Sequence, residues 1–144
     1  LAVVALATVL PQPVQRPRIP VWPVGVWPAP RSMRRTARWD GVMLQRGAGS
    51  DGEGTLRPDE VAEAVAWLRD ERSRLRSEGF AVAEEFDVVL DGELPADRAA
   101  AGALAREYAD AGATWFIEAY WRPSVATPEF QLERVRSGPP LLSS

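Results

Sequence analysis

The chain has 144 residues, of which 46% are apolar and 26% are charged, and its formal net charge at pH 7 is −3. This length fits one domain with a buried core, and the slightly acidic balance argues against nucleic acid as the main partner. The absence of histidine and cysteine excludes an imidazole base, thiol catalysis, disulfides and thiolate metal sites. Catalysis by this chain alone would rest on carboxylates, Tyr, Ser, Thr, Arg or a bound cofactor. A chain without cysteine fits the cytoplasm.

Residues 1–17 are expected to form an extended, proline-rich lead-in. Residues 1–10 are strongly apolar but too short to span a bilayer. They suit either a buried strand or helix end, or the core of a signal peptide. Residues 11–20 contain four prolines, which keep the chain extended. Residues 19–27 then predict a strand, which should be short, irregular or at a sheet edge because its prolines lack ladder donors.

The next stretch predicts a short helix, a strand and a loop. Residues 30–39 suit a helix that begins near its proline and places Met33 and Ala37 on one face. Residues 41–45 form an apolar run typical of a strand buried on both faces. Residues 46–54 contain four glycines and predict a flexible loop.

A long helix is expected to begin at Pro58 and to end at Gly79. Pro58 is followed by two acidic residues, which favour the positive start of a helix. Apolar residues at helical spacing give it one buried face; they are Val61, Val65, Leu68 and Leu75. Three arginines at positions 72, 74 and 76 are expected at its negative end.

The last third of the chain predicts two further strands and two further helices. Residues 86–93 and 113–121 suit buried strands, and residues 95–112 suit the helix between them. Thr127 is expected to cap a final short helix. Residues 139–144 are expected to form a frayed tail.

The fold class that follows is α/β, with four βα units. Strict alternation of short apolar strands with helices indicates a parallel sheet whose crossovers are helical. Four such units form either a small open sheet or one half of an eight-unit barrel, and alternation alone does not distinguish these folds.

Several stretches together resemble the C-terminal part of luciferase-like flavin-dependent oxidoreductases and monooxygenases. In chain order these stretches are residues 10–22, 34–42, 56–69, 86–93, 111–121 and 133–140. The resemblance implies that residues 18–138 form the second half of a TIM (β/α)8 barrel, with strands five to eight. It also implies FMN or the deazaflavin F420 as cofactor and a small organic substrate of unknown identity. The first half of such a barrel, with much of the flavin pocket, has no counterpart here.

The resemblance also implies a cofactor site, because the functional face of a TIM barrel lies at the carboxyl ends of its strands. Gly25 would let the flavin pass close and Trp27 would form a pocket wall, or the two would be a turn glycine and a core tryptophan. Gly92 would allow close backbone approach. Arg122 would bind the phosphate with help from Ser124 and Thr127, or it would be a solvated surface residue.

Several charged residues have two interpretations. Glu118 lies within an apolar strand, so it is expected either to pair with an arginine inside the barrel or to face the cofactor. Glu93, just past its strand, is a weaker candidate for the ribityl hydroxyls. Asp40 precedes a strand and is expected to serve a turn or cap. Arg34 and Arg38, with the arginine between them at position 35, are expected to form a solvated helix face.

Three functions remain open from the sequence. The first is a flavin-dependent oxidoreductase or monooxygenase, in which the cofactor carries the hydride and oxygen chemistry. The second is a non-catalytic half-barrel module, or the product of a decayed gene, that self-associates as a homodimer through its open edges. The third is an open-sheet binder of phosphosugars or nucleotides, which is weakest because no glycine-rich phosphate motif follows any strand. No membrane partner is expected.

Overall fold

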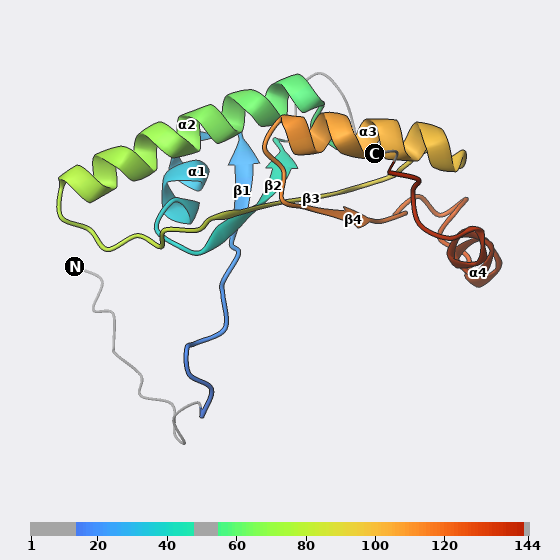
Figure 1. The fold of residues 1–144 in the computed structure, drawn as a ribbon, viewed down its shortest axis with the longest axis horizontal. Helices are drawn as coiled ribbons and strands as arrows, with labels where there is room; N and C mark the ends of the chain where they lie inside the picture. The colour runs from blue at the N-terminus through green and yellow to red at the C-terminus, as the bar shows by residue number, and fades with distance from the viewer. Residues whose placement is uncertain (1–13, 48–54, 143–144) are drawn as a thin grey trace.

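A computed structural model describes residues 14–47 and 55–142. The apolar run at residues 1–10 and most of the predicted glycine-rich loop lie outside these ranges. The described elements alternate as predicted (Figure 1). They are β1 (Val24–Trp27), α1 (Pro30–Thr36), β2 (Gly41–Arg46), α2 (Pro58–Ser77), β3 (Asp87–Gly92), α3 (Arg98–Asp110), β4 (Trp115–Glu118) and α4 (Pro128–Ser137).

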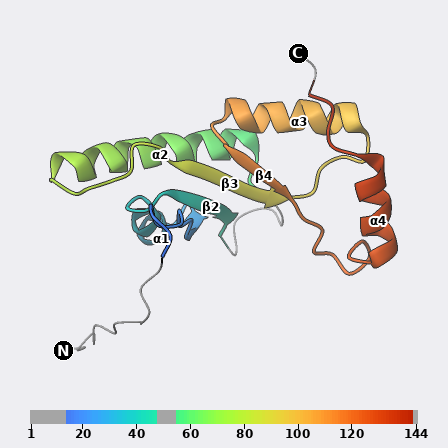
Figure 2. The ribbon, with the colours of Figure 1, turned by 60° about the horizontal axis from the view of Figure 1, so that its bottom comes forward.

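The four strands form one parallel sheet in the order β1-β2-β3-β4. Parallel crossovers are right-handed, so a strand order that follows the chain places successive helices on the same face of the sheet. In agreement, residues of α1, α2 and α3 share one apolar core with β2 and β3. Figure 2 shows α2 and α3 along one side of the sheet, and α4 beyond the end of β4. The α/β class with four βα units is therefore confirmed.

Two of the strands are shorter than predicted. β1 covers Val24–Trp27 rather than residues 19–27, because Pro20 and Pro23 cannot donate to a neighbouring strand. Its predicted place at a sheet edge is confirmed. β4 ends at Glu118, opposite Gly92, where the neighbouring strand β3 also ends.

The register divides the strand residues between two faces. Gly25, Leu44, Leu90 and Phe116 form one row across the sheet, on the face that the helices cover. A row one residue earlier lies on the opposite face, because side chains alternate along a strand. That second row consists of Val24, Met43, Val89 and Trp115.

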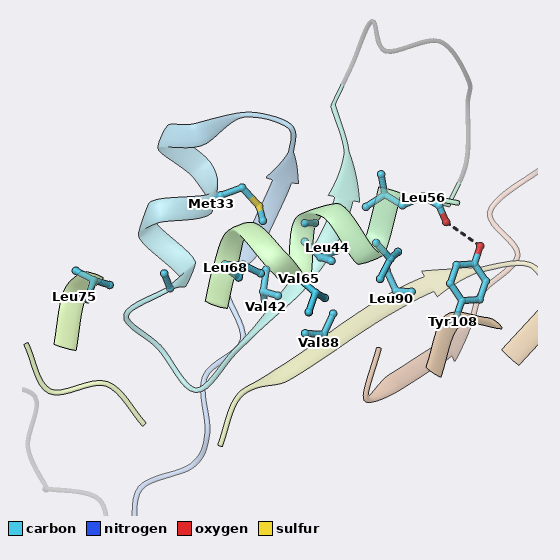
Figure 3. Packing of buried hydrophobic residues seen from close by; sticks show 13 residues of the cluster. Met33, Val42, Leu44, Leu56, Val65, Leu68, Leu75, Val88, Leu90 and Tyr108 are labelled. Carbon is cyan, nitrogen blue, oxygen red and sulfur yellow. Dashed lines mark hydrogen bonds between the residues drawn. The ribbon is translucent and has the colours of Figure 1, made fainter. Parts of the chain in front are cut away.

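The core lies between the sheet and its helices (Figure 3). Leu44 and Leu90 of the sheet pack with Val65 and Leu68 of α2, and Tyr108 of α3 closes one end. Tyr108 also donates a hydrogen bond of 2.8 Å to the carbonyl of Leu56. The apolar faces predicted for α1 and α2 are therefore the faces that are buried.

Local signals set the helix ends; the starts at Pro58 and after Thr127 are as predicted, and α3 begins at Arg98, three residues later than predicted. Asp97 and Thr127 cap α3 and α4 by accepting hydrogen bonds from the backbone N–H groups of Ala100 and Phe130. α2 begins at Pro58, and the chain turns after it at Gly79, whose φ of +85° suits glycine.

Arg72 is buried, which its place near the end of α2 did not indicate. It lies in the C-terminal part of α2, as predicted, but it is only 4% exposed. Its guanidinium donates to the carbonyls of Ala37, Trp39 and Ala83 and lies 4.1 Å from the centroid of the Phe86 ring. The position faces inward because α1 ends beside it and leaves carbonyl groups that need donors.

Within the described ranges, the helices include none that combines the length and the apolar character needed to cross a membrane.

Candidate functional site

The loops that follow β3 and β4 meet at the carboxyl edge of the sheet. The Nε and Nη2 atoms of Arg122 donate to the two carboxylate oxygens of Glu93, at 2.8 and 2.5 Å. The side chain of Arg122 is 66% exposed, and that of Glu93 is 35% exposed. Hydrogen bonding to Arg122 lowers the pKa of Glu93, which favours its ionised form. The structure thus brings two of the predicted site residues into one solvent-facing ion pair.

Apolar side chains are also exposed on the face of the sheet that lacks helices; Ile117 and Trp121 lie toward the carboxyl edge, and Trp115 lies at the start of β4. Trp115 is 56% exposed, Ile117 is 43% exposed and Trp121 is 80% exposed. The indole Nε1 of Trp121 donates to Asp91 over 3.4 Å, and that of Trp115 donates to Asp87 over 3.2 Å. We call the exposed apolar residues Val24, Trp115, Ile117 and Trp121 the open face.

Glu118 lies on the opposite face, toward α4. Its Oε1 accepts hydrogen bonds from Arg134 at 2.6 Å and from the hydroxyl of Tyr120 at 2.5 Å. Burial, together with the hydrogen bond to Glu118, raises the pKa of Tyr120. Of the two interpretations of Glu118, these contacts support pairing with an arginine, although on the helix side rather than inside a barrel. A contact of Glu118 with the cofactor remains a prediction.

Gly25 and Trp27 also lie on the helix side of the sheet. A Cβ atom on Gly25 would lie 2.6 Å from Cγ2 of Val42 and 3.1 Å from the sulfur of Met33. Trp27 packs against the buried core. Trp27 therefore packs as the core tryptophan of the alternative interpretation, whereas Gly25 is a closely packed strand residue rather than a turn glycine. Cofactor binding by these two residues remains a prediction.

Gly92 is the last residue of β3 and is in close contact with Thr55. The space that a side chain would take there is filled by Thr55, whose hydroxyl donates to the carbonyl of Asp91 over 3.0 Å. Close backbone approach does occur at Gly92, but the approaching group is the loop before α2. Ser124 lies in the exposed turn that follows β4, two residues after Arg122.

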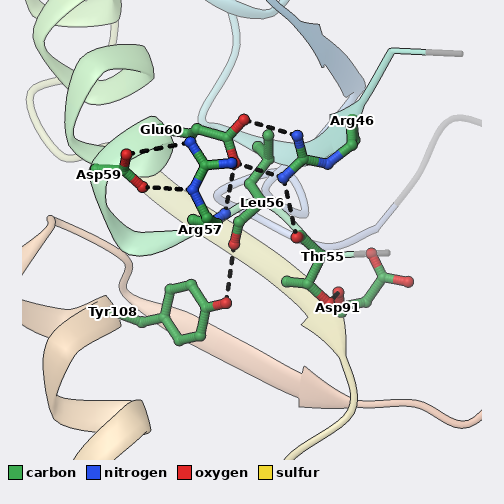
Figure 4. A network of polar contacts seen from close by, with 8 residues as sticks. All are labelled: Arg46, Thr55, Leu56, Arg57, Asp59, Glu60, Asp91 and Tyr108. Atoms are coloured by element: carbon green, nitrogen blue, oxygen red, sulfur yellow. Dashed lines mark hydrogen bonds and ion pairs between the residues drawn. The ribbon is translucent and has the colours of Figure 1, made fainter. Parts of the chain in front are cut away.

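Sequence reasoning missed a polar network that holds the start of α2 against the end of β2 (Figure 4). Arg46 donates through both terminal nitrogens to the carboxylate of Glu60, and through Nη2 to the carbonyl of Thr55 at 3.3 Å. The same carboxylate accepts the backbone N–H of Arg57 at 2.7 Å. A glutamate at the third helical position is a sequence signal for this capping arrangement; the end of an apolar strand gave no signal for Arg46.

Asp40 lies at the amino edge of the sheet, as its position in the sequence predicts. It accepts two hydrogen bonds from Arg18, at 2.6 and 3.0 Å, and one from the backbone N–H of Val21 at 2.7 Å. The hydrogen bonds from Arg18 and then from Val21 lower the pKa of Asp40. This carboxylate therefore ties the proline-rich segment to the turn before β2.

Comparisons of the chain with protein-family models, with curated proteins and with solved structures gave no match. The function of the chain is therefore inferred from the geometry of its residues. Its central feature is a carboxyl edge where an exposed ion pair, Glu93–Arg122, lies near the exposed side chains of Ile117 and Trp121.

Proposed function

We propose that this chain forms the second half of a flavin-binding (β/α)8 barrel and contributes to a cytoplasmic flavin-dependent oxidoreductase or monooxygenase. The strand order carries this proposal. An open doubly wound sheet binds ligands where its strand order reverses, and the order β1-β2-β3-β4 contains no reversal. A barrel binds ligands at the carboxyl edge instead. The same observation argues against the open-sheet nucleotide binder.

The residues at this edge fit one side of a flavin, either FMN or F420. Arg122 has an exposed planar guanidinium suited to a phosphate, and Ser124 adds a hydroxyl nearby in the chain. Ile117 and Trp121 expose apolar surface suited to a flat ring system. When bound, the flavin would supply the hydride and oxygen chemistry. The chain's own residues would bind and orient it, with Arg122 exchanging Glu93 for the phosphate.

The test is a fluorescence titration of the purified chain with FMN and, separately, with F420. We expect saturable quenching with a dissociation constant near 10 µM and about a tenfold weaker affinity for Arg122→Gln, which loses a charge-assisted contact. Arg136→Gln removes an exposed arginine of α4 and serves as the matched control. Absence of quenching up to about 100 µM would contradict the proposal. Equal flavin affinity of Arg122→Gln and Arg136→Gln would also contradict it.

The open face favours a second candidate, a half-barrel module that self-associates. Trp115, Ile117 and Trp121 form an apolar surface that no described helix covers, and β1 and β4 are unpaired parallel edges. Two copies that closed on each other would pair both edges and bury this face.

Sedimentation velocity over a range of concentrations tests this candidate. We expect a concentration-dependent dimer that is abolished in Ile117→Lys and retained in Leu132→Lys, because Leu132 is also an exposed apolar residue but lies on α4. A monomer at all concentrations with no flavin binding would eliminate both candidates. Flavin binding by a monomer would support the first alone.

A further inference from the structure

A second site lies away from the carboxyl edge, in a groove between α1 and α2. The groove has a volume of about 580 Å³, within the range of small-molecule sites. Six arginines line it: Arg18, Arg31, Arg34, Arg35, Arg38 and Arg74. Its other lining residues are Trp39 and Glu71. A chain with a net charge of −3 thus gathers six cations around one groove; of these, Arg18 is paired with Asp40, and Arg74 is paired with Glu71 and Glu78.

Four of these arginines follow a single helical face. Counted from Arg31, the other three follow after three, four and seven positions, at 34, 35 and 38. This spacing places the four side by side along α1 and the turn after it. Neighbouring like charges repel at this spacing, and α1 has no acidic residue in its first turn. The arrangement therefore lacks an internal counter-charge along α1.

The helix dipole explains the positions of only some of these arginines. Cations near the negative ends of α1 and α2 are favourable, which suits Arg34, Arg35 and Arg74. Arg31 lies in the first turn of α1, where the helix dipole opposes a cation. Among the described residues, Arg31 also has no ion pair or side-chain hydrogen bond. No described contact of the fold therefore explains why an arginine stands at position 31.

Hydrogen bonds within the fold hold three of the six guanidinium groups, those of Arg18, Arg35 and Arg74. Glu71 is 9% exposed at the floor of the groove; it accepts two hydrogen bonds from Arg74, at 2.6 and 3.0 Å, and lies 3.9 Å from Arg34. Arg35 donates to the carbonyl of Val24 at 3.0 Å, and Arg38 lies 5.0 Å from the centroid of the Phe80 ring.

These contacts leave donors free. Arg34 and Arg38 make no hydrogen bond in the described part of the chain, and Arg35 makes one of the five that a guanidinium offers. Groups fixed before binding lose little conformational freedom when a ligand arrives. Arginine forks also match the geometry of phosphate oxygens.

We propose that this groove binds a compact anion of two or more phosphate groups, either free or carried by a nucleotide. Several adjacent guanidinium groups suit several adjacent phosphates, since a single phosphate would leave part of the cluster uncompensated. Trp39 is 40% exposed in the groove wall and offers apolar surface to a base if the phosphates are carried by a nucleotide.

Isothermal titration calorimetry with inorganic tripolyphosphate and with ADP, at a fixed 0.15 M salt as a rough physiological value, tests the proposal. We expect a dissociation constant below about 100 µM for at least one of the two. The double variant Arg34→Gln/Arg38→Gln should bind at least about tenfold more weakly. Arg31→Gln should also weaken binding, and it leaves every described contact of the fold in place.

The control is the double variant Arg69→Gln/Arg136→Gln, which makes the same change in net charge at exposed positions outside the groove. Tripolyphosphate binding as tight as that of ADP indicates a free polyphosphate. Tighter ADP binding that Trp39→Leu reduces indicates a nucleotide. Equal weakening in the control, absence of binding at about 1 mM, or binding of poly(U) without binding of tripolyphosphate would overturn the proposal. The groove variants should leave the flavin titration unchanged.

Discussion

Arg72 is a buried cation that has carbonyl groups rather than a carboxylate as its partners. Burial lowers its pKa, the nearby Arg76 contributes in the same direction, and three carbonyl oxygens and the Phe86 ring surround the guanidinium. The side chain thereby connects the end of α1, the turn before β2 and the segment after α2. One residue thus supplies donors to three segments that are distant in sequence.

Replacement of this side chain should be costly. Arg72→Met keeps much of the volume but leaves the carbonyl groups of Ala37, Trp39 and Ala83 without their donors. We expect the free energy of unfolding to fall by about 2–3 kcal/mol, measured by urea denaturation. Arg69→Met, at an exposed position on the same helix, should change it by less than about 0.5 kcal/mol. Equal effects of the two variants would show that the buried contacts do not stabilise the fold.

Gly25 allows a second prediction, because neighbouring side chains fill the space that a side chain at this position would need. Gly25→Ala places a Cβ atom 2.6 Å from Val42 and 3.1 Å from Met33, so we expect a loss of about 1–3 kcal/mol in unfolding free energy from overpacking. Gly79→Ala meets no atom within 4 Å and is strained only through its φ of +85°; it should cost about 1 kcal/mol. If Gly25→Ala is neutral in thermal and urea denaturation, the β1–α1 contact is looser than described.

At the scale of elements, the start of α2 depends on one carboxylate. Glu60 accepts hydrogen bonds from Arg46 and from the backbone of Arg57, and the hydrogen bond from Arg46 is the main cause of its lowered pKa. A carboxyl group whose pKa is lowered by folding stabilises the folded protein when the pH is above the pKa of that group in the unfolded chain, which is near 4.3 for glutamate. That stabilisation is lost as the pH falls through the lower folded value.

Glu60→Gln should therefore change how stability depends on pH. We expect the variant to be less stable than the parent by about 1–2 kcal/mol at pH 7, with the difference shrinking as the pH falls below about 4. Urea denaturation at pH 7, 5, 4 and 3 measures it. Glu63→Gln, an exposed position on the same helix, is the control. A difference between Glu60→Gln and the parent that is constant with pH would show that the Arg46–Glu60 contact is not electrostatic.

For the whole molecule, the elements should differ in stability along the chain. α4 has no buried residue, and it contacts the rest of the fold through Glu118–Arg134 and through the Tyr120–Phe130 ring pair. Regions with few buried contacts open at low free energy. α2, which contributes Val61, Leu68 and Leu75 to the core, should open only when the whole domain unfolds.

Hydrogen exchange followed by mass spectrometry tests this difference. Amides of α4 should exchange before those of α2, and Glu118→Gln should speed exchange in α4 by about fivefold, which corresponds to about 1 kcal/mol. Exchange in α2 should stay unchanged. Glu133→Gln, an exposed position on α4, should have no effect. If α4 and α2 exchange together in the parent, α4 belongs to the same cooperative unit as the core.

The order of the elements, and the starts of α2 and α4, follow from local signals along the chain. Proline, glycine and capping residues act on the backbone within a few positions, so Pro58, Asp97 and Thr127 mark helix starts without help from distant contacts. Apolar spacing likewise identified the buried faces of α1 and α2, because that periodicity follows from local geometry. The parallel α/β class follows from these local features together.

The face of each strand that the helices cover, and the pairing of distant charges, depend on the packing of the whole fold. Gly25, Trp27 and Glu118 are on the helix side because all the crossovers turn the same way, a choice made by the packing of the whole chain. The pairs Glu93–Arg122 and Arg46–Glu60 join residues 29 and 14 positions apart. Such contacts depend on strand order and register, which act across the sheet rather than along the chain.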